Sequence, residues 1–168
     1  LVVDPVMVAK SGAHLLRPDA VDAVTRTLLP RALVVTPNLP EAEVLVGHGI
    51  ADVQGMRTAA REIADKGPRF VIVKGGHLPG AEAVDLLFDG RDFAELRASR
   101  VETLATHGTG CTLSAAITAM LARGESVPSA VRIAKAYVTG AVAAGLSLGQ
   151  GHGPLDHMWS YRRRGVIP

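Results

Sequence analysis

The chain has 168 residues, of which 48% are hydrophobic and 20% are charged, so it has the composition of a globular domain and not of a disordered or low-complexity chain. The formal net charge is only +2, and the one basic cluster is the arginine run at 162–164, which argues against nucleic acid or a membrane surface as a partner. No apolar run approaches the roughly 20 residues of a membrane span. A single cysteine, Cys111, excludes an internal disulfide and favours a cytoplasmic location.

The first residues have the pattern of a strand in a hydrophobic core. Residues 1–4 (LVVD) are typical of a buried strand that ends at Asp4, and neither an initiator Met nor a basic signal-peptide segment precedes them. A domain seldom opens inside a core strand. We therefore expect this chain to be a fragment of a longer protein whose upstream part is missing.

Apolar strands and helices are predicted to alternate through the first half of the chain. Pro18 favours a helix start, Asp52 is a favourable N-cap, and Gly47 is a favourable helix end. The predicted elements are, in order, strand 1–4, helix 18–29, strand 32–36, helix 40–46, a helix from the Asp52 cap to residue 66, and strand 70–74.

The second half begins with a predicted β-hairpin. Residues 83–88 and 93–101 flank Asp89-Gly90, a pair typical of tight turns between antiparallel strands. After the hairpin we expect, in order, a glycine-rich segment at 106–111, a helix to residue 122 and a second helix, rich in small residues, at 128–146.

This alternation predicts an α/β fold, with a mostly parallel sheet flanked by helices and a small antiparallel hairpin at one side. Ligands of such sheets bind beyond the carboxyl ends of the strands. Four polar segments fall at such positions and are expected to converge at one rim: Asp4, residues 36–41, residues 74–76, and the loop before Cys111.

The loop from His107 to Gly110 is suited to hold an anion. Its two glycines, one residue apart, allow close backbone approach, and the helix that follows offers free N–H groups and the positive end of its dipole. A phosphoryl group fits such a cradle, although a Gly-x-Gly pair before a helix is often only a tight turn. Cys111 would act there as a general base; the alternative is a small residue packed at a crowded turn.

Acidic residues near the same rim indicate a cation site. Glu41 would hold Mg²⁺ directly or through water, with Asp4 as the second acid, since Mg²⁺ takes only one or two carboxylates and keeps most of its waters. Asn38 and Glu41 also have the spacing of a capping box, which by itself explains both residues. The two interpretations are compatible, because a cap orients the carboxylate.

Lysine is scarce, and two of the four lysines stand out. Lys74 interrupts the end of an apolar strand just before two glycines, so we expect it to face the ligand crevice and contact phosphate. Lys135 lies among small and apolar residues of a predicted helix, where a side chain that extends to solvent is the simpler interpretation.

Five motifs in series resemble those of one enzyme family. The run 107–117 (HGTGCTLSAAI) is similar to the second signature of the ribokinase (PfkB-like) kinases, and its cysteine in place of the usual aspartate resembles the hydroxymethylpyrimidine/phosphomethylpyrimidine kinases of thiamine biosynthesis. The other similar segments are 4–12 (DPVMVAKSG), 36–43 (TPNLPEAE), 73–77 (VKGGH) and 151–154 (GHGP). The resemblance implies a ribokinase-like fold, of which residues 1–168 would be the C-terminal part that binds nucleotide and transfers the phosphoryl group.

The same resemblance implies ATP, Mg²⁺ and 4-amino-5-hydroxymethyl-2-methylpyrimidine or its monophosphate as ligands, and a homodimer. It does not assign the adenine contacts, for which the helix of Lys135 and the loop 151–154 are candidates. The site residues that it implies form four groups: the base Cys111 with the anion hole Gly108, Thr109 and Gly110; the metal ligands Asn38, Glu41 and Asp4; the nucleotide contacts Lys74, Lys135, Asp4 and Thr36; and the pyrimidine contacts Val6 and Cys111.

Two alternatives stay open. A pyridoxal or pyridoxine kinase is the runner-up, since that substrate is also a planar ring with a hydroxymethyl group. The other is an inactive nucleotide-binding fragment, because members of the family begin with a strand and helices that supply most of the pyrimidine pocket and that this chain lacks. The presence of Cys111, Glu41 and both lysines favours an enzyme.

Overall fold

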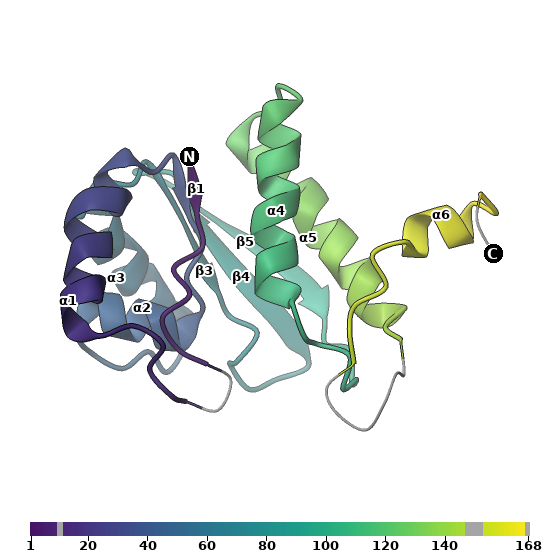
Figure 1. Ribbon diagram of the computed structural model, residues 1–168, viewed down its shortest axis with the longest axis horizontal. Coiled ribbons are helices and arrows are strands. Elements are labelled where there is room, and N and C mark those ends of the chain that lie inside the picture. The colour runs from purple at the N-terminus through teal and green to yellow at the C-terminus, as the bar shows by residue number, and fades with distance from the viewer. Residues whose placement is uncertain (10–11, 147–152, 167–168) are drawn as a thin grey trace. The chain divides into compact units, whose positions relative to one another are not determined.

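Figure 1 shows the computed structural model, which describes residues 1–9, 12–146 and 153–166. The chain divides into two compact units, Leu1–Ser99 and Arg100–Pro168. The first, which we call the sheet unit, contains all the strands of the described sheet; the second, the helical unit, contains α4, α5 and α6. No helix in the described ranges has both the length and the apolar character needed to cross a bilayer.

The sheet unit is built on five strands in the order β1-β2-β3-β4-β5. Their bounds are β1 Val2–Val3, β2 Val34–Val35, β3 Phe70–Lys74, β4 Glu82–Phe88 and β5 Phe93–Ser99. The first three strands are parallel neighbours, whereas β4 pairs antiparallel with both β3 and β5. The sheet is therefore mixed, with as many antiparallel as parallel neighbours, and not mostly parallel as the alternation of elements predicted.

The β4–β5 hairpin forms where Asp89-Gly90 predicted it. Oδ1 of Asp89 accepts the backbone N–H groups of Arg91 at 2.8 Å and Asp92 at 2.7 Å, which closes the turn. Each hairpin strand has seven residues, while β1 and β2 have two each. The hairpin was expected to be small, but its strands are the longest in the described sheet, because a tight turn lets antiparallel strands pair along their whole length.

The helices of the sheet unit begin and end close to the predicted residues. The first starts at Pro18 as α1 (Pro18–Ala23) and continues through a π-helical turn (Val24–Leu28) and a 3-10 turn (Leu29–Arg31). α2 (Leu39–Val46) ends at Gly47, and α3 (Val53–Ala64) follows the Asp52 cap, whose Oδ1 accepts the Gly55 N–H at 2.7 Å.

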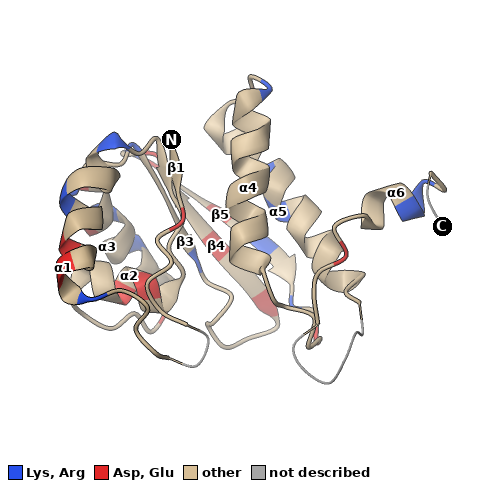
Figure 2. Ribbon diagram, in the orientation of Figure 1, with Lys and Arg blue, Asp and Glu red and all other residues tan. Residues whose placement is uncertain are grey.

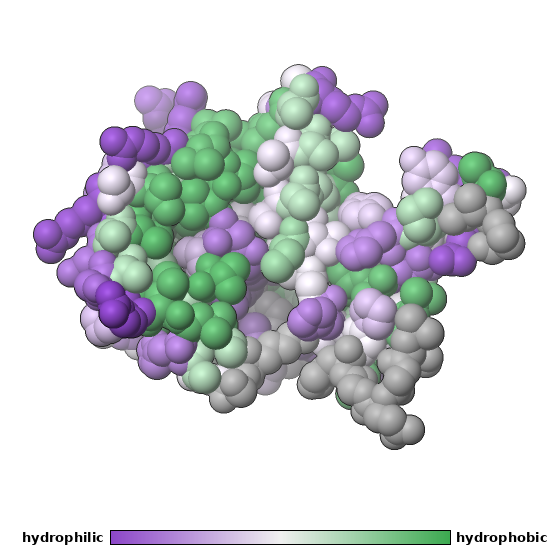
Figure 3. Space-filling view, in the orientation of Figure 1, coloured by the Kyte–Doolittle hydropathy of each residue, from purple (hydrophilic) through white to green (hydrophobic). Residues whose placement is uncertain are grey.

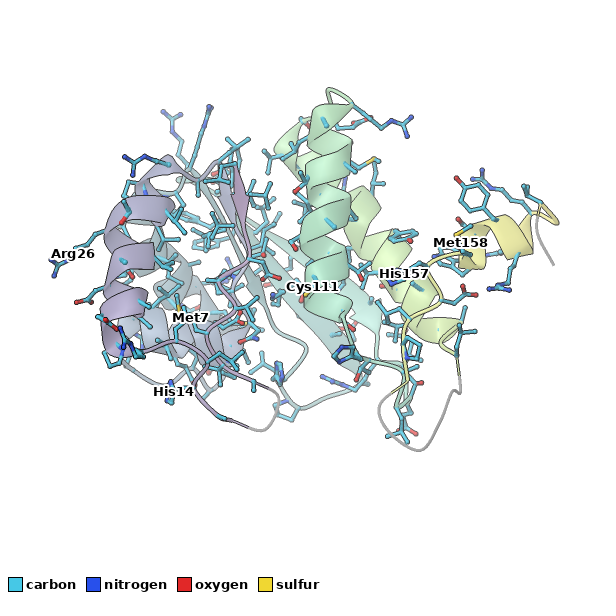
Figure 4. The ribbon with its side chains drawn as sticks, viewed as in Figure 1. Met7, His14, Arg26, Cys111, His157 and Met158 are labelled. Atoms are coloured by element: carbon cyan, nitrogen blue, oxygen red, sulfur yellow. The ribbon has the colours of Figure 1, made fainter. Side chains whose placement is uncertain are left out.

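The core of this unit lies where α3 packs against β3 and β4. Alternate residues of the strands belong to it, such as Val71 and Val73 of β3, together with Met56 and Ile63 of α3. Met7, labelled in Figure 4, belongs to the same core and is only 1% exposed, so it anchors the loop that leaves β1.

The helical unit is organised around α4 (Thr109–Ala122) and α5 (Val127–Ala143), which pack side by side (Figure 1). α5 begins at the Ser126 cap and ends before the predicted residue 146. No charged residue occurs in α4, as its uniform colour in Figure 2 and its pale to green surface in Figure 3 show. The buried residues of both helices are small or apolar.

A short helix, α6 (Trp159–Arg163), completes this unit and docks on α5. Nε1 of Trp159 donates to the Tyr137 carbonyl at 3.1 Å, and the Tyr137 hydroxyl donates to the His157 carbonyl at 2.8 Å. Nε of Arg162 donates to Oδ2 of the buried Asp156 at 3.0 Å. One member of the arginine cluster is therefore part of the internal structure of the unit.

Gly75, directly after β3, lies where the backbone of β4 leaves no room for a side chain. A Cβ at this position would collide with the Val84 carbonyl oxygen and lie 3.0 Å from Cε of Met56. We expect Gly75→Ala to lower the free energy of unfolding by about 1–3 kcal/mol, as overpacking does, measured by urea unfolding. Gly76→Ala is the matched control, because no heavy atom lies within 4 Å of a Cβ there. Equal losses in the two variants would contradict this account.

Candidate functional site

The carboxyl ends of β1, β2 and β3 bring three polar residues into contact. Asp4 follows β1, Thr36 follows β2, and Lys74 is the last residue of β3. Oδ1 of Asp4 accepts the Thr36 hydroxyl at 3.1 Å and the Lys74 ammonium at 2.8 Å. Because parallel neighbours end at the same edge of a sheet, the predicted meeting of these three strand ends is confirmed.

The N-terminus of α2 adds Asn38 and Glu41 to this group. Oδ1 of Asn38 accepts the Glu41 N–H at 2.9 Å, and Oε2 of Glu41 accepts the Asn38 N–H at 2.8 Å, so the predicted capping box is complete. Pro40, in the first turn, has no N–H that would need a partner. The cap holds the Glu41 carboxylate at the helix end whose dipole favours a negative charge.

Lys74 links the two carboxylates. Its Nζ lies 2.8 Å from Oδ1 of Asp4 and 3.9 Å from Oε2 of Glu41. The side chains are 13% exposed in Lys74, 14% in Asp4 and 3% in Glu41. When all three are ionised, this buried group has one negative charge in excess, so it attracts a further cation.

Burial raises the pKa of Glu41 above its ordinary value of 4.5. The backbone of Asn38, the Lys74 ammonium and the backbone of Met7 favour the charged form, but burial outweighs them. A divalent cation beside this carboxylate would supply the charge that solvent does not. Burial therefore penalises the charged form of Glu41, and a neighbouring cation would favour it.

Two residues beside this group were not predicted from the sequence. The backbone of Met7 hydrogen-bonds to Glu41, and Oδ1 of the buried Asp85 accepts the Gly75 N–H at 3.1 Å. Met7 gives no signal in the sequence because its contact is made by the backbone. Asp85 does give one: it is an acid within the apolar run of β4, directly opposite Lys74 in the strand register.

Val6 lies in the loop after Asp4. Its backbone N–H donates to the Asp4 carbonyl at 3.0 Å, which turns the chain away from β1. Its side chain is 48% exposed. An apolar side chain in this position is accessible to a ligand, and its contact with the pyrimidine stays a prediction.

In the helical unit, the start of α4 has the features of an anion cradle. Gly108 is the N-cap with φ +84°, a conformation that residues with a Cβ adopt at a cost. The hydroxyl of Thr112 donates to the Gly108 carbonyl at 2.8 Å. In the described ranges, the backbone N–H groups of Gly110 and Cys111 have no acceptor. They remain available to an external anion.

Cys111 is exposed at this end of α4 (Figure 4). The loop before it meets a second predicted motif, since the His107 N–H donates to the Gly153 carbonyl at 3.3 Å. Residues 151 and 152 of that motif lie outside the described residues. Lys135 is half-buried in the middle of α5, within the same unit.

The predicted site residues thus form two groups. Five are brought together in the sheet unit: Asp4, Thr36, Asn38, Glu41 and Lys74. The helical unit contains Gly108, Thr109, Gly110, Cys111 and Lys135. Of the four polar segments expected at one rim, three are therefore shown to meet, and the place of the fourth at that rim stays a prediction.

Comparison with known proteins gives the family. A family model described as phosphomethylpyrimidine kinase matches residues 1–156. The chain belongs to this family. The hydroxymethylpyrimidine/phosphomethylpyrimidine kinase of Streptomyces coelicolor is 52% identical over 159 residues, which cover 95% of this chain and 59% of that protein. The chain thus spans about three fifths of the length of the curated relatives it matches.

Solved structures confirm the ribokinase-like α/β fold. The pyridoxal kinase from Staphylococcus aureus in complex with AMP-PCP has a TM-score of 0.86 at 42% identity, with 93% of this chain and 57% of that chain covered. The phosphomethylpyrimidine kinase from Clostridium difficile has a TM-score of 0.71 at 44% identity, with 82% and 55% covered. The fold is therefore shared by kinases of both ring substrates.

The sheet-unit carboxylates fit Mg²⁺. Among the residues with assigned positions, no three His, Cys, Asp or Glu side chains form a group that could hold a metal on their own. Mg²⁺ at a nucleotide site needs only one or two carboxylates, because phosphates and waters complete its shell. The Lys74 ammonium, 2.8 Å from Asp4 and 3.9 Å from Glu41, shows that a cation is favoured there.

The capping role of Glu41 can be separated from its charge. We expect Glu41→Ala to lower the free energy of unfolding by about 0.5–2 kcal/mol, the usual cost of a lost cap. Glu41→Gln keeps an acceptor for the Asn38 N–H and should retain the stability of the wild type. Chemical unfolding without divalent cations measures both variants. A loss as large for glutamine as for alanine would show that the charge of Glu41, and not its cap, stabilises this helix end.

Proposed function

We propose that this chain is the nucleotide-binding and phosphoryl-transfer part of a kinase that uses ATP and Mg²⁺. Its substrates would be 4-amino-5-hydroxymethyl-2-methylpyrimidine and then the monophosphate, which becomes the diphosphate of thiamine biosynthesis. Family membership supports this substrate class. The observation that carries the proposal is the buried contact of Lys74 with the carboxylates of Asp4 and Glu41, a group suited to phosphates and a divalent cation.

In the sheet unit, the charged groups would bind and orient the phosphates. Asp4 is held in one orientation by the Thr36 hydroxyl and the Lys74 ammonium, and Glu41 is held by its cap with Asn38. Bound Mg²⁺ would neutralise charge that develops on the phosphate oxygens. Because Thr36 and the Asn38 cap hold the two carboxylates before the ligand arrives, these carboxylates need little reorganisation at the moment of transfer.

In the helical unit, the start of α4 would act on the transferred group. The open N–H groups of Gly110 and Cys111 would donate to oxygens of the γ-phosphoryl group. Cys111 would accept the proton of the substrate hydroxyl as that oxygen forms its bond to phosphorus, while the bond from phosphorus to the leaving ADP oxygen breaks. Lys135 would contact the nucleotide phosphates, as the family resemblance implies.

A pyridoxal kinase is the second candidate. It is favoured by the similarity to the Staphylococcus aureus pyridoxal kinase, at 42% identity and a TM-score of 0.86. Both ring substrates offer a hydroxymethyl group to the same transfer chemistry. The proposal further includes a homodimer in the cytoplasm, which sedimentation of the purified protein and cell fractionation would test.

The substrate assignment predicts a strict dependence on the acceptor ring. We expect the full-length protein with ATP and Mg²⁺ to form ADP rapidly with hydroxymethylpyrimidine and more slowly with pyridoxal, in a coupled assay of ADP release. The Glu41→Gln variant, which keeps the capping box, should lose most of this activity because it lacks a metal ligand. Faster turnover of pyridoxal would instead identify a pyridoxal kinase.

The role of Cys111 predicts a separation of binding from catalysis. We expect Cys111→Ala to lower kcat by about 100-fold or more, the range of general-base catalysis, and to leave the Kd of a non-hydrolysable ATP analogue nearly unchanged. Thr118→Ala is the matched control, since Thr118 is an exposed residue of the same helix two turns further along. A kcat of the Cys111 variant equal to that of the control would exclude Cys111 as the base.

A further inference from the structure

The buried group of the sheet unit contains a cation of its own. Lys74 Nζ is 2.8 Å from Asp4 and 3.9 Å from Glu41, and all three side chains are at most 14% exposed. Two carboxylates removed from water to this extent require a compensating charge. Without a metal, the Lys74 ammonium provides it.

We propose that the Lys74 ammonium substitutes for the divalent cation while the nucleotide is absent, so that Lys74 makes metal binding depend on nucleotide binding. The inference rests on the proposed function, because it takes Asp4 and Glu41 as the metal ligands. The phosphates of a nucleotide draw the ammonium away from Asp4, and the carboxylates then accept the metal. Metal alone must displace Lys74 and therefore binds weakly.

The geometry gives Lys74 the freedom that this exchange needs. Its backbone is fixed, since its N–H donates to the Pro37 carbonyl at 2.8 Å and the residue pairs with Asp85 of β4. Its side chain is a flexible four-carbon stem that ends in a compact charge. The ammonium can therefore turn from a carboxylate to a phosphate without any movement of the sheet.

The oxygen atoms involved show why the two cations compete. Oδ1 of Asp4 already accepts two donors, the Thr36 hydroxyl and the Lys74 ammonium. A metal that binds this oxygen would lie close to the ammonium, and two like charges at such a distance repel each other. A phosphate between them removes the repulsion, so each cation then favours the other.

Thermodynamic linkage between nucleotide binding and metal binding makes this proposal measurable. If the nucleotide raises the affinity for metal, the metal raises the affinity for nucleotide by the same factor. A neutral residue at position 74 removes the competitor, so metal should bind more tightly without nucleotide, and the nucleotide should add less. A purely structural Lys74 predicts the opposite, because an Asp4 that has lost its partner would be a less well-ordered ligand.

The experiment measures Mn²⁺ binding from the electron paramagnetic resonance signal of the free ion, with and without a non-hydrolysable ATP analogue. We expect Lys74→Gln to bind Mn²⁺ about tenfold more tightly than wild type without nucleotide, within the usual range of coupling between sites. The factor by which the analogue raises the Mn²⁺ affinity should be smaller than in the wild type by the same tenfold. Lys74→Arg, which keeps a positive charge at this position, should not show the tighter Mn²⁺ binding of Lys74→Gln.

Lys66→Gln is the matched control, since Lys66 belongs to the same unit and forms no ion pair within the described ranges. Thermal melting shows whether each variant folds, and Lys74→Met serves if Lys74→Gln does not. Equal Mn²⁺ affinity in the wild type and both neutral Lys74 variants would overturn this proposal. It would not contradict the proposed kinase function. Absence of Mn²⁺ binding in every variant, even with the analogue, would overturn the metal assignment in the proposed function, and this inference with it.

Discussion

The half-buried ion pair between Asp4 and Lys74 is the interaction on which the candidate site depends. It joins residues 70 positions apart in the sequence, at a distance of 2.8 Å. Removal of either partner would leave an unpaired charge in a largely desolvated position, which destabilises a fold. The pair forms because β1, β2 and β3 are parallel neighbours whose ends meet at one edge, so the geometry of the site depends on the topology of the sheet.

At the start of α2, the bonds that stabilise the helix end also orient a carboxylate of the candidate site. Glu41 completes a capping box with Asn38, and the cap explains why a carboxylate that is 3% exposed is retained at this point. The same bonds fix the orientation of the carboxylate toward Lys74. The carboxylate of this cap lies beside a second acid, Asp4, so under the proposed function the cap also orients a metal ligand.

The sequence was most informative where one local pattern determines the outcome. The capping box at Asn38, the cap at Asp52 and the turn at Asp89-Gly90 were all predicted, because short-range hydrogen bonds specify them. The parallel strand ends could be predicted to meet from topology alone. The backbone contact of Met7 and the length of the hairpin could not, because the first involves no side-chain pattern and the second depends on pairing along whole strands.

The chain is similar both to pyrimidine kinases and to pyridoxal kinases, and the proposed roles of its residues explain why. Under the proposed function, the groups at the strand ends and those at the start of α4 would act on phosphates, a divalent cation and a hydroxyl. All of these are the same whether the ring is a pyrimidine or a pyridine. Among the residues assigned from the sequence, only Val6 and Cys111 were expected to contact the ring. Similarity to both a pyridoxal kinase, at 42% identity, and a pyrimidine kinase, at 52% identity, is then expected. If Val6 contacts the ring as predicted, a change at this position would alter ring preference and leave the ion pair between Asp4 and Lys74 unchanged.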